Sequence, residues 1–182
     1  GGMPLAAHIS VIMPRNFNEY NLKEQIRAIN SQCEAFGMQI SGGHTQINDM
    51  VKAPVVTVTG IGVTDRTEVI SSKNIRPGQH IVMTKWIGIG GIRKLIDLKR
   101  NEMREKYTDY VIDKAYGSEE DMSVKREAQL ALKAGAVAMH DVAEGGIFAA
   151  LWDMAQAGNV GLDIDFRSIP VKQEIIELCE MY

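Results

Sequence analysis

The stretch His140-Asp141-Val142-Ala143-Glu144-Gly145-Gly146, followed at once by IFAALWDMA over residues 147–155, decides the fold of this chain. Apolar residues recur at helical spacing in its second part, so residues 147–155 predict an amphipathic helix. The apolar run just before it, at residues 136–140, predicts a short buried strand. A polar loop with two glycines is therefore expected to join a strand to a helix. Ligands of α/β proteins gather at such carboxyl ends of strands.

This loop carries the strongest chemistry in the sequence. His140, Asp141 and Glu144 can exchange a proton or contact a cation, which makes them the candidate catalytic residues. Gly145 and Gly146 lie at the predicted helix start, where backbone N–H groups favour an anion. The structural alternative is that Asp141 only caps the helix.

A second glycine-bearing element, Gly42-Gly43-His44-Thr45, follows a short strand predicted at residues 38–41. Adjacent glycines can adopt positive φ and let the backbone approach a ligand closely. A turn of this kind exposes N–H groups that form an anion-binding nest, which suits a phosphate. His44 and Thr45 would add hydrogen bonds. An ordinary glycine turn is the competing interpretation.

A third element, Gly88-Ile89-Gly90-Gly91, lies between a strand predicted at residues 80–84 and a helix predicted at residues 92–107. It invites a dinucleotide-binding interpretation, but Arg93 occupies the place of the third glycine in the GxGxxG pattern. Lys85 and Arg93 flank the turn and could help to hold a phosphate, although a tight turn without a ligand fits equally well. No GxxxxGK[ST] sequence occurs, which excludes a P-loop, and no serine lies in a GxSxG elbow.

Outside these motifs the pattern alternates between strands and helices. Asn21 and Glu24 have the spacing of a capping box and predict the start of a helix that ends at Gly37. Further strands are predicted at residues 5–13, 54–62 and 161–166, and further helices at residues 119–134 and from Pro170 onward. The predicted class is α/β (α+β), with a domain junction between residues 65 and 77.

The composition excludes several classes of function. Hydrophobic residues make up 45% and charged residues 24% of the chain, as in ordinary globular proteins. The net charge of -3 argues against an electrostatic nucleic-acid or membrane partner. No apolar run reaches the roughly 18 residues that span a bilayer. Cys33 and Cys179 lie far apart, which predicts free thiols and a cytoplasmic protein.

The segment from His140 to Ala155, with residues 160–165 and 169–171 downstream, resembles the second-domain signature of the AIR-synthase-like superfamily. Gly42–Thr45 and the strand after it resemble the superfamily's Gly-Gly-[Asp/Glu/His]-[Thr/Ser] element, and residues 78–91 resemble the stretch that opens its second domain. Members include AIR synthase, the hydrogenase-maturation carbamoyl dehydratase, selenophosphate synthetase, thiamine-monophosphate kinase and the synthetase of formylglycinamidine ribonucleotide. The resemblance extends from about residue 20 to residue 172.

This resemblance implies a two-domain fold. Residues 1–68 would be a partial N-terminal domain on the ATP-binding side, and residues 69–182 a truncated C-terminal α/β domain. Strands of the first domain are expected to join a barrel shared by a homodimer. ATP and Mg²⁺ are the implied cofactors, and the implied chemistry transfers a phosphoryl group to an oxygen of a small-molecule substrate. The resemblance places the catalytic candidates of the 140–144 loop on the substrate side and the following residues near the nucleotide: Gly42, Gly43, His44, Thr45, Gly145 and Gly146.

Two departures from the superfamily pattern limit this transfer. The glycine-rich, aspartate-bearing N-terminal segment has no counterpart here, so the chain is expected to be an incomplete copy that is cut at both ends. His44 stands where many members have an acidic residue, and a neutral imidazole is a poor Mg²⁺ ligand. The leading hypothesis is that the full-length protein is an ATP-dependent enzyme, closer to hydrogenase-maturation proteins than to the AIR synthase of purine biosynthesis. The alternative is a non-catalytic nucleotide-binding or assembly relative of the same fold.

Overall fold

The computed structural model describes residues 2–65 and 69–182, and it divides into two compact units, Gly1–Val69 and Ile70–Tyr182. Each unit is described by itself. The junction predicted at residues 65–77 includes residues 66–68, which lie outside the described part of the chain. Helices and a sheet are mixed along the chain, which confirms the predicted α/β class.

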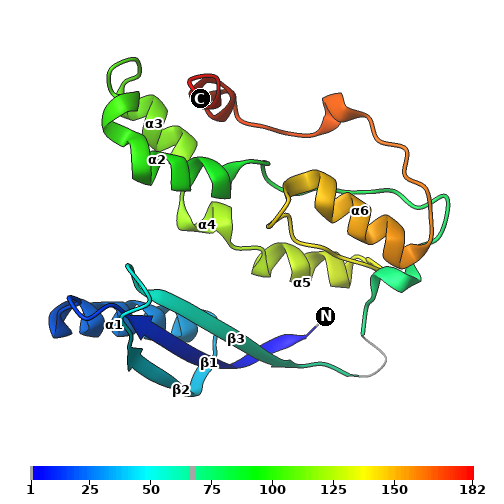
Figure 1. Ribbon diagram of the computed structural model, residues 1–182. Coiled ribbons are helices and arrows are strands. Elements are labelled where there is room, and N and C mark those ends of the chain that lie inside the picture. Colours follow the sequence, from blue (N-terminus) through cyan, green and yellow to red (C-terminus); the bar gives the residue numbers. More distant parts are fainter. Residues whose placement is uncertain (1, 66–68) are drawn as a thin grey trace. The chain divides into compact units, whose positions relative to one another are not determined.

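Unit 1 is a three-stranded sheet with one helix (Figure 1). The central strand β1 (Met3–Met13) pairs in parallel with β2 (Gln39–Ile47) and antiparallel with β3 (Val55–Val63). Helix α1 (Glu19–Ala35) connects β1 to β2. Strands predicted at residues 5–13 and 54–62 are confirmed as β1 and β3.

The core of unit 1 lies between β1 and α1. Alternate residues of β1 are buried, as expected for a strand with one covered face, and Cys33 of α1 packs against them: Ala7, Ile9, Val11 and Met13. The helix begins earlier than predicted, because Asn18 is the N-cap and its side chain accepts a hydrogen bond from the Asn21 N–H at 2.8 Å. The capping box predicted at Asn21 and Glu24 is therefore wrong. The predicted stop at Gly37 is confirmed, with a φ of 70°.

Unit 2 contains six helices and two short 3₁₀ turns in its described residues: α2 (Ile89–Met103), α3 (Asp109–Tyr116), α4 (Glu119–Met122), α5 (Lys125–Lys133), α6 (Gly146–Gly158), α7 (Gln173–Cys179), η2 (Ser72–Asn74) and η3 (Phe166–Ser168). The main core joins α2, α3 and α7. Its fully buried side chains include Ile96, Met103, Ile112 and Leu178. Helix α6 buries only Ala150.

Three predicted strands are wrong in this unit. Residues 80–84, 136–140 and 161–166 contain no strand. Their apolar patterns are typical of strands, but a strand needs a hydrogen-bonded neighbour, and the described chain supplies none for them. The helix predicted at residues 119–134 is instead two helices, α4 and α5, separated by Ser123 and Val124.

Candidate functional site

The loop of residues 140–145 leads directly into α6. Gly145 is the N-cap of α6 in the left-handed region (φ 77°), no side chain caps the helix, and Gly146 follows with a φ of 67°. A Cβ on Gly145 would lie 2.6 Å from the Cβ of Ala149. Both glycines are therefore dictated by the backbone path. The alternative interpretation, in which Asp141 caps the helix, is wrong.

The start of α6 is suited to an anion. No side chain takes up the N–H groups of its first turn, and the helix dipole adds a partial positive charge there. Asp141 and Glu144, both exposed in the preceding loop, carry the opposite charge. Phosphate groups and carboxylates near each other are compatible when a divalent cation lies between them.

The donor set limits what kind of metal site this loop can form. Within residues 2–65 and 69–182, no group of three or more His, Cys, Asp or Glu side chains could hold a metal ion. Mg²⁺ is usually bound through one or two carboxylates together with substrate phosphates. Asp141 and Glu144 supply two carboxylates, so a cation at this loop would need further ligands from outside it.

His140 is held at one ring nitrogen and faces a carboxylate at the other. Its Nδ1 lies 2.6 Å from the backbone carbonyl oxygen of Asp141, so Nδ1–H donates to that oxygen. Its Nε2 lies 3.8 Å from the carboxylate of Asp153 on α6. The side chain is about one-third exposed, so Nε2 can exchange a proton with a ligand. Asp153 was not expected from the sequence, because nothing in its spacing separates it from the polar face of α6.

The Gly42–Thr45 element lies inside a strand and not in a turn. The strand predicted at residues 38–41 continues to Ile47 as β2, and Gly43 pairs with Ile9 of β1. A Cβ on Gly43 would lie 1.8 Å from the Ile9 carbonyl oxygen, just after the register shift between Ala7 and His8. Close approach of two strands thus explains this glycine. Because β2 is an edge strand, its outer backbone groups remain open to a ligand.

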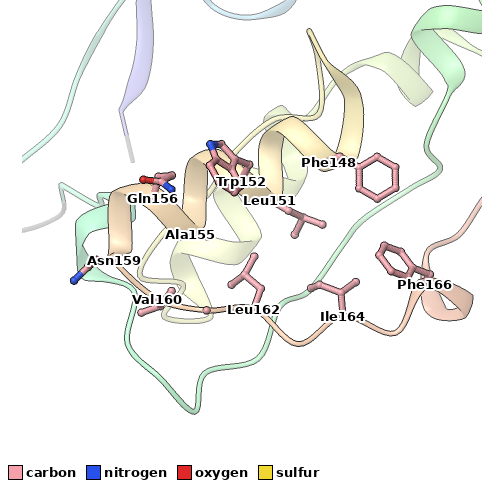
Figure 2. Close-up of a pocket in the computed structure, with 11 residues that line it drawn as sticks. Phe148, Leu151, Trp152, Ala155, Gln156, Asn159, Val160, Leu162, Ile164 and Phe166 are labelled. Atoms are coloured by element: carbon pink, nitrogen blue, oxygen red, sulfur yellow. The ribbon is translucent and has the colours of Figure 1, made fainter.

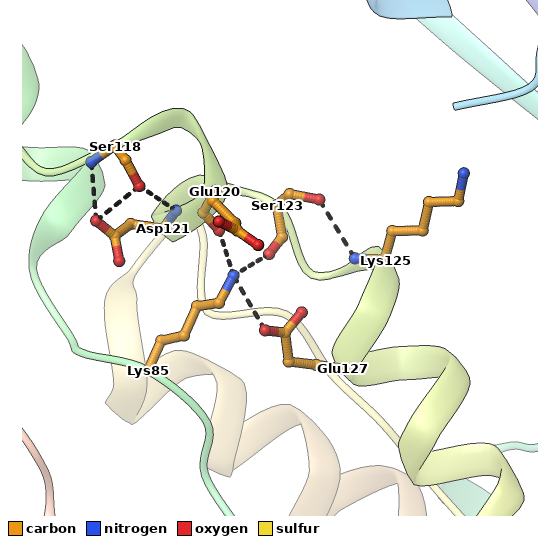
Figure 3. Close-up of polar contacts among 7 residues, drawn as sticks. All are labelled: Lys85, Ser118, Glu120, Asp121, Ser123, Lys125 and Glu127. Carbon is orange, nitrogen blue, oxygen red and sulfur yellow. Dashed lines mark hydrogen bonds and ion pairs between the residues drawn. The ribbon is translucent and has the colours of Figure 1, made fainter. Parts of the chain in front are cut away.

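The Gly88–Gly91 turn is occupied by structural contacts. Gly88 is the left-handed N-cap of α2. The Lys85 ammonium donates to the backbone carbonyls of Glu120 and Ser123 and lies 3.1 Å from the Glu127 carboxylate (Figure 3). Arg93 contacts the Glu119 carboxylate and the Ser118 carbonyl and stacks on the Tyr116 ring. All three donors of Lys85 are engaged, so this side chain is not poised to hold a phosphate. The Arg93 side chain is only 13% exposed and both of its terminal nitrogens have partners.

The two ligand motifs belong to different units. Gly42–Thr45 lie in unit 1, and His140–Gly146 lie in unit 2. No helix in the described residues is long and apolar enough to cross a membrane.

Two domain families match this chain. The family described as AIR synthase related protein, N-terminal domain, matches residues 1–64, and AIR synthase related protein, C-terminal domain, matches residues 76–182. The second match alone covers more than half of the chain.

Curated relatives align over almost the whole chain. It is 31% identical over 183 residues to the selenide, water dikinase of Caldanaerobacter subterraneus subsp. tengcongensis, covering 100% of this chain and 49% of the relative. It is 29% identical over 184 residues to the carbamoyl dehydratase HypE of Rhizobium leguminosarum bv. viciae, covering 99% and 50%. It is 25% identical over 178 residues to the thiamine-monophosphate kinase of Pyrococcus horikoshii, covering 98% and 53%. The chain thus spans about half the length of the curated relatives it matches.

Solved structures share the fold. HypE of E. coli, a hydrogenase maturation protein, superposes with a TM-score of 0.81 at 18% identity, over 100% of this chain and 54% of that chain. A ThiL structure complexed with AMPPCP and TMP superposes with a TM-score of 0.79 at 19% identity, over 100% and 56%. At this identity the likeness establishes the architecture of the chain.

Proposed function

This chain belongs to the AIR synthase related protein family, and from this premise we propose that it is part of an ATP-dependent enzyme acting on a small molecule. In this proposal the enzyme uses ATP and Mg²⁺ to phosphorylate or otherwise activate an oxygen of its substrate. The relatives support ATP use: one is named a dikinase, one a kinase, and one HypE structure is in complex with ATP. Names that concern hydrogenases, among them HypE and a putative hydrogenase expression/formation protein of Methanocaldococcus jannaschii, favour a maturation-type substrate over one of purine biosynthesis.

The observation that carries the proposal is the uncapped start of α6 behind two left-handed glycines. The Gly146 N–H donates to the Ala143 carbonyl at 3.1 Å, so the remaining N–H groups of the first turn, together with the helix dipole, would hold an anionic oxygen of the nucleotide or of the phosphorylated substrate. ATP, when bound, supplies the phosphoryl group. In a phosphoryl transfer of this kind, the protein contributes mostly by positioning the reactants and by stabilising charge.

His140, Asp141 and Glu144 would handle protons and the cation. Because Nδ1 of His140 is engaged by the Asp141 carbonyl, Nε2 is the atom that would accept a proton from a substrate hydroxyl. Asp153 would then stabilise the imidazolium that forms. Asp141 and Glu144 would contact Mg²⁺ that is already bound to the phosphates.

The Gly42–Thr45 element belongs to unit 1. We propose that unit 1 is the nucleotide-side domain, with Gly42, Gly43, His44 and Thr45 near the phosphates. His44 would donate or accept a hydrogen bond, since a neutral imidazole is a poor Mg²⁺ ligand. The sheet would pair with that of a second copy to give a homodimer, and the protein would work in the cytoplasm.

The test is calorimetric titration of the chain with ATP and Mg²⁺, followed by turnover assays with candidate acceptors. Replacing Gly146 with alanine strains a left-handed residue, so nucleotide affinity should fall by about tenfold or more. Gly161→Ala is the matched control, because that glycine has open space around it and no positive φ. Absence of both binding and turnover in the wild-type chain would defeat the proposal.

A double substitution separates the enzyme from the non-catalytic alternative. His140→Gln with Asp141→Asn should leave binding of the nucleotide without Mg²⁺ within about threefold and lower turnover by about 10²-fold or more. If the double variant binds nucleotide and keeps full biological activity, the loop is structural and an assembly role in the same fold gains support.

A further inference from the structure

The sheet of unit 1 has a second face, which α1 does not cover. Ile9 and its alternate neighbours on β1 pack against α1, so His8 and Ser10 project to the opposite face. His44 of β2 is the registered partner of Ser10 and therefore lies on this face as well. Both imidazoles are exposed. Two of the four histidines of the chain thus share one surface of the sheet.

The two imidazoles are near enough to bind one ion together. His8 is paired with Gly42, which precedes His44 by two residues on β2, so the histidines are diagonal neighbours. Diagonal neighbours on adjacent strands lie about 7–8 Å apart, within reach of aromatic side chains. The His8 ring also lies on the β2 side, since a Cβ on Gly42 would be 3.7 Å from its Nδ1 and Cε1. Side-chain rotation can therefore place one nitrogen of each ring about 2 Å from a shared ion.

The ring nitrogens are available to a ligand. Within residues 2–65 and 69–182, neither His8 nor His44 makes a hydrogen bond or an ion pair. The partner of His8 on β2 is a glycine, so no side chain stands between the rings. On the other side, Thr59 and Thr57 of β3 pair with His8 and Ser10 and offer hydroxyl groups. The paired residues around the histidines carry no carboxylate, so the site would bind a metal through nitrogen and not through charged oxygen.

The groove beside α6 offers no comparable set of ligands. It has a volume of about 690 Å³ and is lined by apolar, aromatic and amide side chains (Figure 2). None of the described residues that line it is His, Cys, Asp or Glu. Outside the 140–146 loop, the pair on the sheet is therefore the better candidate for a metal.

We infer that His8 and His44 form a binding site for one divalent transition-metal ion of the class that imidazole prefers, which includes zinc. One nitrogen of each ring binds the ion. Water occupies the remaining positions, because two protein ligands are fewer than a closed tetrahedral site requires. The site discriminates against Mg²⁺, which takes oxygen ligands. The inference goes beyond the proposed function, since it requires neither ATP nor phosphoryl transfer.

Titration of the chain with Zn²⁺ alone, followed by the imidazole resonances, tests the site. The resonances of His8 and His44 should shift together, at the same zinc concentration. In His8→Asn and in His44→Asn, the remaining ring should bind zinc about tenfold or more weakly, while unchanged amide resonances of β1 show that the variants are folded. His80→Asn, which changes an exposed histidine of unit 2, should leave the titration of both rings unchanged. An excess of Mg²⁺ should also leave it unchanged.

Three results would overturn the inference. The first is that the two rings shift at different zinc concentrations or do not shift. The second is that the remaining ring in either single variant titrates as in the wild type, since each histidine would then bind independently. The third is saturation of both rings at one ion for two chains, because the ligands would then come from two copies. These titrations contain no nucleotide, so their failure and the failure of the ATP titration are separate results.

Discussion

Gly43 shows how a residue that suggests a ligand can be required by packing. Its backbone lies so close to β1 that any side chain would meet the carbonyl of Ile9. Gly43→Ala must therefore push β1 and β2 apart, and we expect it to lower the stability of unit 1 by about 2 kcal/mol or more. Hydrogen exchange of the β1 amides measures the stability of unit 1. Tryptophan fluorescence cannot replace it, because Trp86 and Trp152 both lie in unit 2 and report only on that unit.

Gly60 in β3 is the control for this substitution. A Cβ there meets nothing within 4 Å, and its φ is not positive. Gly60→Ala should leave the free energy of unfolding of unit 1, as derived from exchange of the β1 amides, within about 0.5 kcal/mol of wild type. Equal effects of the two substitutions would contradict the steric explanation of Gly43.

Lys85 combines a strained backbone with a saturated ammonium. Its φ of 61° is unusual for a residue with a side chain, and its Nζ holds the carbonyls at the end of α4 together with Glu127 of α5. Lys85→Ala should lower the free energy of unfolding of unit 2 by about 2–3 kcal/mol, since these are hydrogen bonds to a charged group. Lys85→Gly loses the same contacts but relieves the strain, so it should be about 1 kcal/mol more stable than Lys85→Ala.

Urea unfolding followed by tryptophan fluorescence measures both variants. Lys94→Ala is the control, because Lys94 is exposed on the neighbouring helix α2. An alanine variant at position 85 as stable as wild type would show that the three contacts contribute nothing.

At this scale the sequence predicted the composition of the loop but not its geometry. His140, Asp141 and Glu144 were recognisable as a polar group beside two glycines. The approach of Asp153 to His140 depends on how the loop folds back onto α6, which no local spacing encodes. The engagement of Lys85 was likewise hidden, because its partners lie 35 to 42 residues further along the chain.

Among the elements, helices were predicted better than strands. The periodicity of α1, α2 and α6 is local, and each helix satisfies its own backbone, so their existence followed from the sequence while their ends moved by several residues. A strand depends on a partner that the pattern does not reveal. Residues 161–166 show this, because they alternate correctly yet have no neighbour in the described chain.

The short helix α4 gives unit 2 a sensitivity to acid. The Asp121 carboxylate accepts from the Ser118 N–H at 2.8 Å, and this bond, with Lys172 nearby, lowers the pKa of Asp121 below its ordinary value. A carboxyl whose pKa is lower in the folded state stabilises the fold above its unfolded pKa. That contribution is lost as the pH falls through the folded pKa. The pKa values of Glu127 and Glu174 are lowered as well, first by backbone hydrogen bonds and then by Lys85 and Lys114.

We therefore expect Asp121→Asn to reduce the stability of unit 2 at pH 7 by about 1 kcal/mol. The difference from wild type should shrink as the pH is lowered below about 4. Thermal unfolding between pH 7 and pH 3 measures this, with Asp97→Asn on the exposed side of α2 as control. A difference that stays constant over this range would rule out the carboxylate as the cause.

For the molecule as a whole, the sequence motifs identified the family correctly, whereas the arrangement of helices and strands was predicted less accurately. The HDVAEGG loop and the glycine pair at residues 42–43 pointed to the superfamily, and the domain matches over residues 1–64 and 76–182 confirm it. Motifs succeed here because a glycine in the left-handed region or against a neighbouring strand is fixed by sterics. The residues of a surface that binds a partner are not fixed by sterics in this way, so no sequence motif marks such a surface.

The sheet of unit 1 leads to the last prediction, which concerns assembly. Both outer strands are edges, and large apolar side chains along them are exposed: Ile40, Ile47, Val55, Val58, Ile61 and Val63. An exposed apolar edge of this length pairs with another chain unless something blocks it. We expect the protein to sediment as a homodimer, and Val58→Lys to shift it to monomer because a lysine would be placed in the buried interface. Leu98→Lys, which changes an apolar residue of α2 that is more exposed than Val58 (73% against 54%), should remain dimeric. A wild-type monomer at tens of micromolar by analytical ultracentrifugation, or dissociation by Leu98→Lys instead of Val58→Lys, would refute the assignment of this sheet as the interface.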